Sequence, residues 1–210
     1  FGDSDFLKAS KVAGTVKRII NVSSGSAYGD GGFGDTGWTG RLDEYKTVDD
    51  PITLYAISKY ASERIARRLG KVMALDVCNV RLSAIFGPWE YDTGLRDTLS
   101  APMQASLLAL SGSAAILSRK ESRDWTYSRD VAEALFALMD NKSLSYDLYN
   151  ITSGSPWSVQ DWCACLAKTF PNFSYRFASD NDEPNVELFG ERDRLTMSSE
   201  KLIQDTGYVL

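Results

Sequence analysis

Residues 16–29 read VKRIINVSSGSAYG, and this stretch decides the fold. Val16–Ser23 passes from a basic start into a short β-branched, apolar run, which predicts a buried strand of a parallel sheet. Ser24 and Gly25 follow directly, and the glycine-rich segment from Gly29 to Gly40 must be a loop. The sequence therefore predicts a buried strand that ends in a serine- and glycine-rich turn.

Helical and strand patterns alternate on both sides of this stretch. Before it, Asp5–Ala13 shows helical spacing and stops at Gly14, a helix C-terminal signal. After it, the patterns predict helices at Leu54–Leu69, Val131–Met139, Ser158–Phe170 and Ser199–Asp205, and strands at Val77–Phe86, Ala114–Ser118 and Tyr146–Ile151. The rest of the chain after residue 170 reads as polar and irregular. Strands that alternate with helices imply an α/β fold with a mainly parallel sheet.

The helix predicted at Leu54–Leu69 has two distinct faces. The apolar residues at helical spacing, expected to face inward, are Ile57, Tyr60, Ala61, Ile65 and Leu69. The charged residues, expected to face solvent, are Glu63, Arg64, Arg67 and Arg68.

The chain has 210 residues, a formal net charge of −5 and no histidine. Without histidine, these residues cannot form a Ser-His-Asp triad, a Cys-His nucleophile pair, a His-Glu-x-x-His zinc site or a C₂H₂ finger. Acid–base chemistry must therefore use Tyr, Lys, Asp, Glu or Cys. A polyphosphate partner requires a basic face, so the charge balance argues against nucleic acid.

Three cysteines, Cys78, Cys163 and Cys165, are too few for a disulfide framework. We interpret Cys163 and Cys165 as packing residues, because two thiols without histidine make a poor metal site. No apolar run approaches the ~20 residues of a membrane span, and no charged-then-apolar leader opens the sequence. We therefore expect a cytoplasmic protein with no membrane partner and no bound metal.

Tyr55 and Lys59 lie one turn apart on the same face of the predicted helix. A phenol with a pKa of about 10 is a poor acid or base at neutral pH, and a nearby ammonium group lowers that pKa. A tyrosine tuned in this way can take a proton from a hydroxyl while hydride leaves the same carbon. Taken alone, the pattern is more typical of a surface lysine one turn from a half-buried tyrosine.

The segment Val22–Gly29 places serine hydroxyls directly after the predicted strand. In open parallel sheets, ligands bind at the carboxyl ends of the strands. A hydroxyl at this edge could therefore hydrogen-bond the reacting oxygen of a substrate. A turn that only ends the strand is the simpler alternative.

Five motifs, which cover most of residues 15–155, follow one another along the chain. Their order resembles the extended short-chain dehydrogenase/reductase family, and its NAD-dependent sugar epimerase/dehydratase branch in particular. The motifs are Ser23-Ser24-x-x-x-Tyr28-Gly29, Pro51-x-x-x-Tyr55-x-x-Ser58-Lys59-x-x-x-Glu63, Arg81 with Phe86-Gly87-Pro88, Arg123-Asp124-Trp125-Thr126-Tyr127 with Asp130-Val131, and Tyr149-Asn150-Ile151.

The resemblance implies the C-terminal part of a Rossmann-type doubly wound parallel sheet, with a small α/β substrate-binding portion. Residues 1–88 would belong to the dinucleotide-binding domain and carry the Ser/Tyr/Lys site. Residues 89–210 would mainly bind substrate, with about 124–152 returning to the sheet. The implied cofactor is NAD or NADP, and the implied assembly is a homodimer through the helix that carries Tyr55.

The resemblance also implies a role for each matching residue. Tyr55 would be the catalytic acid/base, Lys59 would hold the nicotinamide ribose, and Ser24 would bind the substrate oxygen. Arg123 matches an arginine that commonly contacts the diphosphate of a nucleotide sugar. The other implied contacts are Val22, Ser23, Leu82 and Ser83 along the cofactor, and Gly25, Ser26 and Ala84 along the substrate.

Some positions depart from the pattern of this branch. Gly25 and Ser26 stand where its dehydratases carry an Asp-Glu pair, and neither can supply the acid for 4,6-dehydration. Ala84 stands where the family has a substrate-binding Asn. These differences argue against dehydration and weaken the case for a standard nucleotide sugar.

The late Arg-x-Gly-Asp element of the family is altered as well. It reads Gly190-Glu-Arg-Asp193 here, so its arginine has moved. Arg192 or Arg194 could take its place, although two surface arginines are the simpler interpretation. A free sugar, a sugar acid or a lactone-forming aldose therefore stays open beside a nucleotide sugar.

A literal Gly-x-Gly-x-x-Gly occurs at 32–37, but we reject it as the cofactor fingerprint. It lies several residues past the predicted strand and lacks a helix immediately after it. The resemblance implies that the fingerprint precedes residue 1, within three βαβ units of roughly 80–100 residues in all. If 210 residues were the whole molecule, we would expect no tight dinucleotide binding.

Two classes of function stay open. The first is an NAD(P)-dependent epimerase or dehydrogenase that uses Ser24, Tyr55 and Lys59 on a sugar. The second is a non-catalytic nucleotide-sensing or scaffold protein on the same fold, although such proteins commonly lose the Tyr or the Lys. A serine hydrolase is excluded, because the sequence has neither a histidine nor a Gly-x-Ser-x-Gly elbow.

Overall fold

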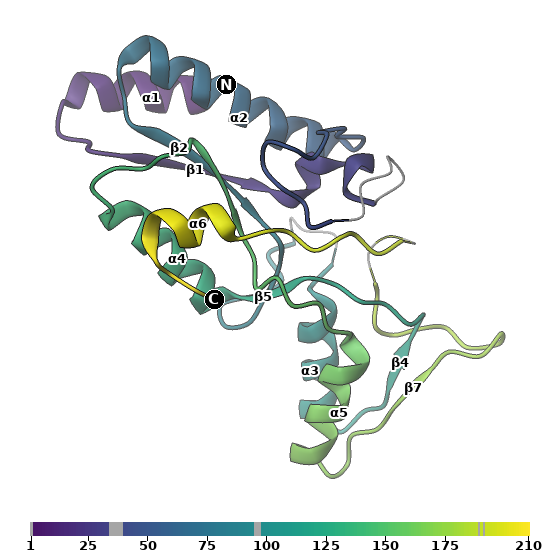
Figure 1. Ribbon diagram of the computed structural model, residues 1–210. Helices are drawn as coiled ribbons and strands as arrows, with labels where there is room; N and C mark the ends of the chain where they lie inside the picture. Colours follow the sequence, from purple (N-terminus) through teal and green to yellow (C-terminus); the bar gives the residue numbers. More distant parts are fainter. Residues whose placement is uncertain (1, 34–39, 95–97, 189, 191) are drawn as a thin grey trace.

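The structure is a computed structural model that describes residues 2–33, 40–94, 98–188, 190 and 192–210. Its main body has helices on both faces of a parallel sheet with the strand order β1-β2-β6 (Figure 1). The strands are β1 (Ile19–Ser24), β2 (Val77–Leu82) and β6 (Leu148–Ile151). The helices are α1 (Gly2–Ala13) and α2 (Leu54–Met73) on one side, and α4 (Ser128–Asp140) and α6 (Glu200–Thr206) on the other.

A smaller lobe is attached to this body (Figure 1). In it, two helices pack together beside a parallel strand pair, and a second parallel pair connects the lobe to the body. The elements of the lobe are α3 (Ala101–Ser111), α5 (Val159–Thr169), β4 (Ala115–Leu117) and β7 (Tyr175–Phe177), and the connecting pair is β3 (Ala84–Phe86) with β5 (Trp125–Tyr127). This architecture confirms the predicted α/β fold with parallel sheets.

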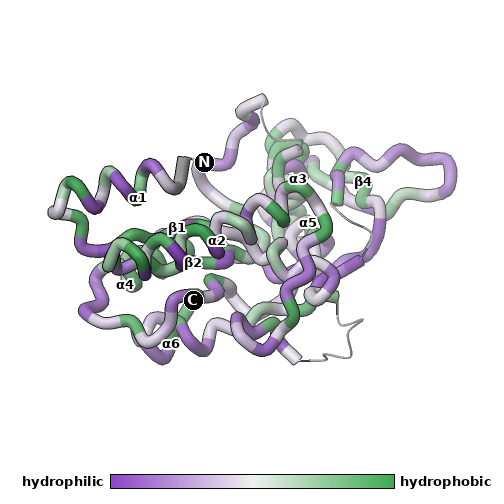
Figure 2. The backbone as a smooth tube through the Cα atoms, turned by 90° about the horizontal axis from the view of Figure 1, so that it is seen from above, coloured by the Kyte–Doolittle hydropathy of each residue, from purple (hydrophilic) through white to green (hydrophobic). Residues whose placement is uncertain are grey.

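The middle strand β2 is buried on both faces, as expected for a parallel strand between two layers of helices. It contributes to a core that forms between the sheet, α4 and α6, and Figure 2 shows hydrophobic and hydrophilic stretches intermixed around β1 and β2. The buried residues of this core are Cys78, Val80, Val131, Ala134, Leu138, Tyr149, Ile151 and Leu202. All eight lie within strands or helices that the sequence predicted.

The segment Val77–Phe86, which the sequence predicts as one strand, forms two. Ser83 N donates a hydrogen bond of 3.1 Å to Ile151 O, whereas Ala84 N donates one of 3.1 Å to Asp124 O. The chain therefore changes partner between these two residues, and β2 pairs with β6 while β3 pairs with β5. A local apolar pattern cannot show this change, because both partner strands lie far along the chain.

Three elements, α3, β5 and β7, were missed by the sequence prediction. α3 carries apolar residues on every side, so it has no amphipathic pattern. Its start was nevertheless marked: Ser100 Oγ accepts a hydrogen bond from Met103 N at 3.3 Å, and Pro102 lies in the first turn. β5 and β7 have three residues each, too few for a periodic signal.

α2 packs with a different face from the predicted one. Ile57 and Ala61 are exposed, whereas Glu63 is only 4% exposed. The other buried positions of the helix are the small residues Ala56, Ala66 and Gly70. Small side chains allow the helix to approach the sheet closely, and a Cβ on Gly70 would lie 2.9 Å from Val77 Cγ2.

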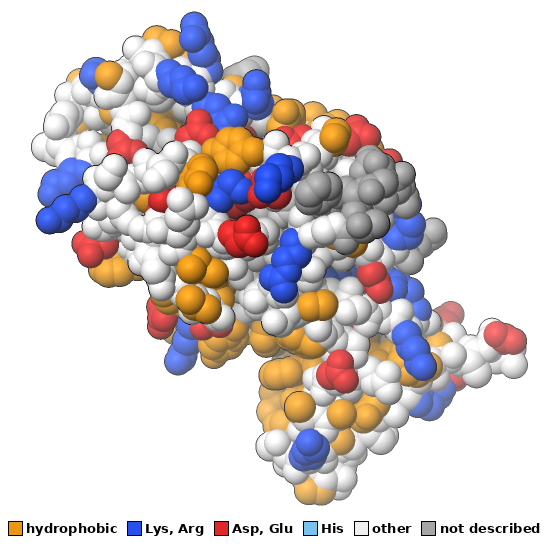
Figure 3. Space-filling view, viewed as in Figure 1, with side chains coloured by type: hydrophobic (Ala, Val, Ile, Leu, Met, Phe, Trp, Pro, Cys, Tyr) orange, Lys and Arg blue, Asp and Glu red, His pale blue; other side chains and the backbone are white. Residues whose placement is uncertain are grey.

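The surface carries charges of both signs. On the face shown in Figure 3, acidic and basic side chains are interspersed, and hydrophobic side chains gather on the smaller lobe. Within the described ranges, no helix is both long enough and apolar enough to cross a lipid bilayer. Cys78 and Cys163 are buried free thiols, but Cys165 is exposed, so the interpretation of Cys165 as a packing residue was wrong.

Candidate active site

The carboxyl ends of β1 and β2 lie side by side, because Ile19 pairs with Val77 and Ser24 with Leu82 in one parallel register. Ser24 ends β1 and caps the 3-10 helix η1 (Gly25–Tyr28), where its Oγ accepts a hydrogen bond of 3.1 Å from Ser26 N. Since a hydroxyl can accept and donate at once, its O–H hydrogen can still reach a ligand. The predicted serine thus lies at the edge where open parallel sheets bind ligands.

α2 begins beside this edge and carries Tyr55 and Lys59 in its first turns. Thr53 caps the helix, its Oγ1 accepting a hydrogen bond of 3.1 Å from Ala56 N. Lys59 Nζ lies 5.8 Å from the centroid of the Tyr55 ring and donates a hydrogen bond of 3.1 Å to Val22 O. One ammonium group therefore contacts both the tyrosine, which is 55% exposed, and the strand that ends in the serine.

Val22 and Ser23, which were predicted to lie along a cofactor, differ in orientation. Val22 is 41% exposed. Ser23 is buried, and its hydroxyl donates a hydrogen bond of 2.5 Å to Glu63 Oε1 inside the protein. Any contact of Ser23 with a cofactor would therefore use its backbone.

Arg81 in β2 is fully buried and contacts three surrounding segments. Its Nε and Nη2 donate to Oε1 and Oε2 of Glu63 at 2.9 and 2.7 Å. Its Nη1 donates to Asp49 Oδ1 at 2.6 Å, and its guanidinium lies 4.4 Å from the centroid of the Tyr28 ring. Burial alone would lower the pKa of Arg81, but the hydrogen bonds to Glu63 and Asp49 raise it above its ordinary value.

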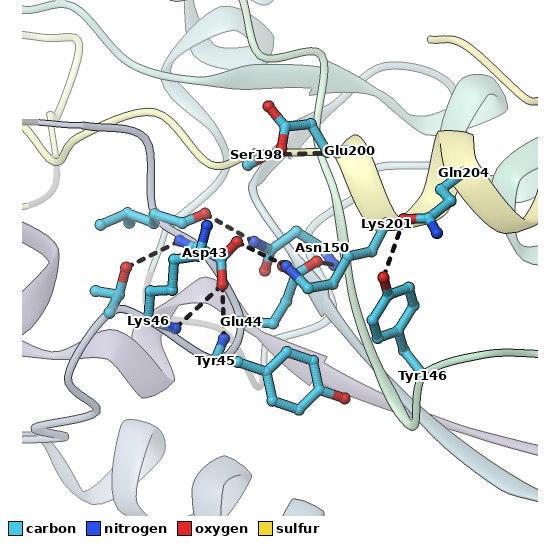
Figure 4. Close-up of polar contacts among 12 residues, drawn as sticks. Asp43, Glu44, Tyr45, Lys46, Tyr146, Asn150, Ser198, Glu200, Lys201 and Gln204 are labelled. Atoms are coloured by element: carbon cyan, nitrogen blue, oxygen red, sulfur yellow. Dashed lines mark hydrogen bonds and ion pairs between the residues drawn. The ribbon is translucent and has the colours of Figure 1, made fainter.

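Tyr28, the last residue of η1, is buried, and this burial raises the pKa of its phenol. Its hydroxyl donates a hydrogen bond of 2.9 Å to Asn150 Oδ1. Asn150 in turn donates from its backbone N to Glu44 Oε1 at 2.7 Å and from Nδ2 to Leu42 O at 3.0 Å. Lys201 of α6 pairs with Glu44 in the same cluster (Figure 4), so the turn after Ser24 is connected to the opposite helix layer.

Leu82, Ser83 and Ala84 lie half-buried where the chain passes from the main sheet to the smaller lobe. Ser83 Oγ and Thr126 Oγ1 are 2.6 Å apart and share a hydrogen bond. The backbone bonds that tie this crossing to both sheets fix its three residues next to the end of β1.

Gly25 and Ser26 form the turn that follows the serine. A Cβ on Gly25 would lie 2.8 Å from Met197 Sδ and 3.3 Å from Leu82 O, so a side chain at this position would require Met197 to shift. Ser26 Oγ accepts a hydrogen bond of 3.3 Å from Arg194 Nη1. One of the two arginines that the sequence left open, Arg194, thus contacts the residue two positions after the predicted catalytic serine.

Arg194 and Arg123 lie close enough to repel each other. Partial burial and the charge of Arg123 lower the pKa of Arg194, which also stacks 5.3 Å from the Phe33 ring centroid. Burial lowers the pKa of Arg123 too, although Glu121 partly opposes this effect. Guanidinium groups such as these can donate charge-assisted hydrogen bonds to an anion.

A sequence profile of the NAD dependent epimerase/dehydratase family matches residues 3–152. The chain belongs to this family. The match includes Ser24, Tyr55, Lys59 and Arg123, but it ends before Arg194.

Relatives of this epimerase/dehydratase chain come from bacteria and plants. It is 26% identical over 172 residues to an uncharacterised 37.6 kDa protein of Escherichia coli O111:H-, covering 72% of this chain and 47% of that protein. It is 26% identical over 184 residues to UDP-glucuronate 4-epimerase 3 of Arabidopsis thaliana, covering 80% of this chain and 40% of that protein. The chain thus spans less than half the length of these two relatives.

Solved structures share its fold. A crystal structure of UDP-glucuronic acid 4-epimerase from Bacillus cereus, in complex with UDP-glucuronic acid and NAD, aligns with a TM-score of 0.70 and 18% identity. The alignment covers 98% of this chain and 60% of that one. The epimerase/dehydratase chain therefore has the Rossmann-type fold that its motifs implied.

Sequence reasoning missed the buried partners of the candidate site. It assigned Glu63 to the solvated face of its helix, although the carboxylate pairs with Arg81 inside the protein. One signal was available: Arg81 stands in an otherwise mostly apolar strand, and a buried arginine requires a counter-charge. The rejected Gly-x-Gly-x-x-Gly at 32–37 lies mostly outside the described residues.

Proposed function

We propose that the complete protein is an NAD(P)-dependent oxidoreductase or epimerase that acts on a sugar, a sugar acid or a nucleotide sugar. Ser24, Tyr55 and Lys59 would carry the chemistry. The observation that supports this most strongly is the position of Lys59 Nζ, 5.8 Å from the Tyr55 ring centroid and 3.1 Å from Val22 O. Through these two contacts, Lys59 connects Tyr55 to the end of β1, which carries Ser24.

In this proposal Tyr55 exchanges a proton with the hydroxyl or carbonyl oxygen of the reacting carbon. Ser24 would donate a hydrogen bond to the same oxygen, since its O–H is not used in the bond that its Oγ accepts from Ser26 N. Lys59 would hold its ammonium group beside the Tyr55 ring, 5.8 Å from the centroid, where it faces the charge that develops during proton transfer. The partial exposure of Tyr55 leaves its hydroxyl open to a substrate.

The residues at this edge fit the nicotinamide half of NAD or NADP, which would accept or return the hydride when bound. Lys59 uses one of its three N–H donors on Val22 O, and the others suit the hydroxyls of a ribose. The exposed Val22 and the half-buried Leu82 supply apolar surface beside them. Ser83 would line the same pocket.

On the substrate side, we assign Arg123 and Arg194 to a negatively charged group. The hydrogen bond from Arg194 Nη1 to Ser26 Oγ supports the assignment of Arg194, because Ser26 belongs to the turn after Ser24. Gly25, Ser26 and Ala84 would contact the sugar. A nucleotide sugar fits best, because its diphosphate supplies the anion and its sugar the reacting carbon.

Replacing Tyr55 by Phe in the complete protein tests the proposal. Turnover should fall at least ~100-fold if Tyr55 is the acid/base. Tyr60→Phe, on the same helix, is the matched control and should stay within about threefold, as expected for a residue outside the site. The assay is NAD(P)-dependent conversion of UDP-glucose, UDP-glucuronate and dTDP-glucose. Near-normal turnover in Tyr55→Phe would exclude this mechanism, and cofactor binding without any turnover would favour the nucleotide-sensing alternative.

We also propose a homodimer in the cytoplasm. Exposed apolar side chains on α1 and α2 support a helix-mediated interface, since Phe6, Leu54 and Val72 are 60%, 88% and 60% exposed. The three free thiols support a reducing compartment. Light scattering of the complete protein should give twice the protomer mass, and a single protomer would contradict the dimer.

A further inference from the structure

The charged residue Glu63, which nothing so far assigns to the reaction, holds together the elements that carry the candidate site. Its Oε1 accepts hydrogen bonds from both Ser23 Oγ, at 2.5 Å, and Arg81 Nε, at 2.9 Å. Ser23 directly precedes Ser24 in β1, and Glu63 lies one turn after Lys59 in α2. The carboxylate therefore connects the serine strand to the tyrosine helix.

Neighbouring side chains of α2 also contact β1, at the strand residues next to Ser23. Lys59 Nζ bonds Val22 O at 3.1 Å, and Ser62 Oγ bonds Asn21 Oδ1 at 3.2 Å. Three consecutive strand residues are thus held by one turn of the helix. Of these contacts, the Glu63 contact is the buried, charged one, with 5% of the side chain exposed.

Arg81 fixes the orientation of this carboxylate. Its guanidinium binds both oxygens of Glu63 and also contacts Asp49 and the Tyr28 ring, so its position is set from three directions. A bidentate arginine–carboxylate pair is planar and directional. It therefore transmits the position of β2 to both α2 and the turn that begins at Ser24.

We propose that Glu63 and Arg81 are positioning residues of the reaction, which set the separation of Ser24 from Tyr55 and Lys59. This inference rests on the proposed function. Neither residue contacts the reacting atoms: both lie beneath the site and act through Ser23 and through the helix. A displacement of about 1 Å in such a site lowers turnover by roughly 100-fold, without a matching loss of substrate affinity.

Glu63→Gln in the complete protein is the direct test. Gln keeps the shape and one acceptor oxygen but loses the charge and the bidentate pair, while Asp49 still neutralises Arg81, so the fold should persist. The matched control is Asp76→Asn, which breaks the Arg18–Asp76 ion pair of 2.7 Å beside the amino end of β1, away from the site. Each variant is compared at equal folded fraction.

Two readouts separate positioning from simple stability. The first is steady-state kinetics with NAD(P) and whichever of UDP-glucose, UDP-glucuronate and dTDP-glucose the wild type converts fastest. We expect kcat of Glu63→Gln to fall about 10- to 100-fold with KM within threefold, and Asp76→Asn to stay within threefold in both. The second is amide hydrogen exchange of residues 22–28, which should speed up about tenfold or more in Glu63→Gln and not in Asp76→Asn.

The outcomes also separate this inference from the proposed function. If Tyr55→Phe loses turnover but Glu63→Gln keeps kcat within twofold of wild type, the positioning role is wrong and the proposed function stands. If the wild type converts no sugar, hydrogen exchange alone decides, and unchanged exchange at 22–28 overturns the inference. Should Glu63→Gln not fold, Ser23→Ala removes the same contact with a milder change and is judged by the same criteria.

Discussion

Lys201→Met should destabilise the protein strongly, because this lysine neutralises two carboxylates beneath α6. Its Nζ lies 2.6 Å from Asp43 Oδ2 and 3.0 Å from Glu44 Oε2, in the cluster drawn in Figure 4. It also lies 5.5 and 5.7 Å from the ring centroids of Tyr45 and Tyr146. Met keeps the length and most of the apolar contact of the side chain but removes the charge.

The magnitude follows from the burial of the partners. The side chain of Glu44 is 0% exposed and that of Asp43 is 9% exposed. Removing one partner of a buried ion pair costs about 3–5 kcal/mol, and the lower end applies because Lys201 and Asp43 keep some contact with water. We therefore expect a loss of about 3 kcal/mol, equivalent to a fall of about 6–12 °C in Tm for a chain of this size.

The loss of stability caused by Lys201→Met should also depend on pH. Burial raises the pKa of Glu44 above its ordinary value of 4.5, although hydrogen bonds from Asn150 and Lys201 oppose the rise. Without Lys201 the pKa rises further, so the folded variant binds a proton at a pH where the unfolded chain does not. A proton that only the folded state binds stabilises the folded state. The loss in free energy of unfolding caused by Lys201→Met should therefore shrink as the pH falls from 7 to 5. In the wild type the pKa of Lys201 is raised above 10.5 and that of Asp43 is lowered below 3.8, so neither titrates in this window. In the variant Asp43 also loses the Lys201 contact that lowers its pKa, which acts in the same direction as the change at Glu44.

Urea unfolding at pH 7, 6 and 5 is the assay. Lys46→Met, an exposed lysine in the same loop, is the control and should change stability by no more than about 0.5 kcal/mol. The double variant Lys201→Met with Glu44→Gln should recover at least about 1 kcal/mol of the loss, because it removes the buried charge that was left unpaired. A Lys201→Met variant that matches the wild type at pH 7, or a deficit that grows as the pH falls, would refute the reasoning.

Two further substitutions test other parts of the site. Gly29→Ala should cost more than about 3 kcal/mol in urea unfolding, because φ is +54° there and the new Cβ would lie 1.5 Å from Asp50 O; a loss below about 1 kcal/mol would show that the turn can relax. Arg194→Met should weaken binding of UDP to the complete protein about tenfold or more by calorimetry, as expected for a lost charge-assisted hydrogen bond, and a Kd within twofold of wild type would remove Arg194 from the anion site.

The sequence predicted those parts of the fold that depend on local patterns. Gly14, with φ of +66°, follows the last residue of α1, as its position in the sequence implied. The crossing at Ser83 could not be predicted, because the change of strand partner depends on Ile151 and Asp124, which are distant in sequence. α3 was missed because a helix that is apolar on every side has no amphipathic period.

The site shows the same division. The motifs placed Ser24 at a strand end and Tyr55 with Lys59 on one helix face, and the structure brings the lysine to the strand. The burial of Glu63 could not be read from its helix, because a carboxylate among arginines usually faces solvent. Burial of the Glu63 carboxylate becomes favourable only because Arg81, in strand β2, supplies two hydrogen bonds and the opposite charge.

The central claim is that Tyr55 carries the proton transfer of an NAD(P)-dependent reaction on a sugar. A single-turnover experiment tests it most directly: the complete protein is loaded with oxidised cofactor and mixed with its best nucleotide sugar, and the absorbance of reduced nicotinamide is followed. The account predicts a transient in the wild type that is at least ~100-fold slower in Tyr55→Phe, with cofactor affinity unchanged within threefold. The same rate in both proteins would contradict it.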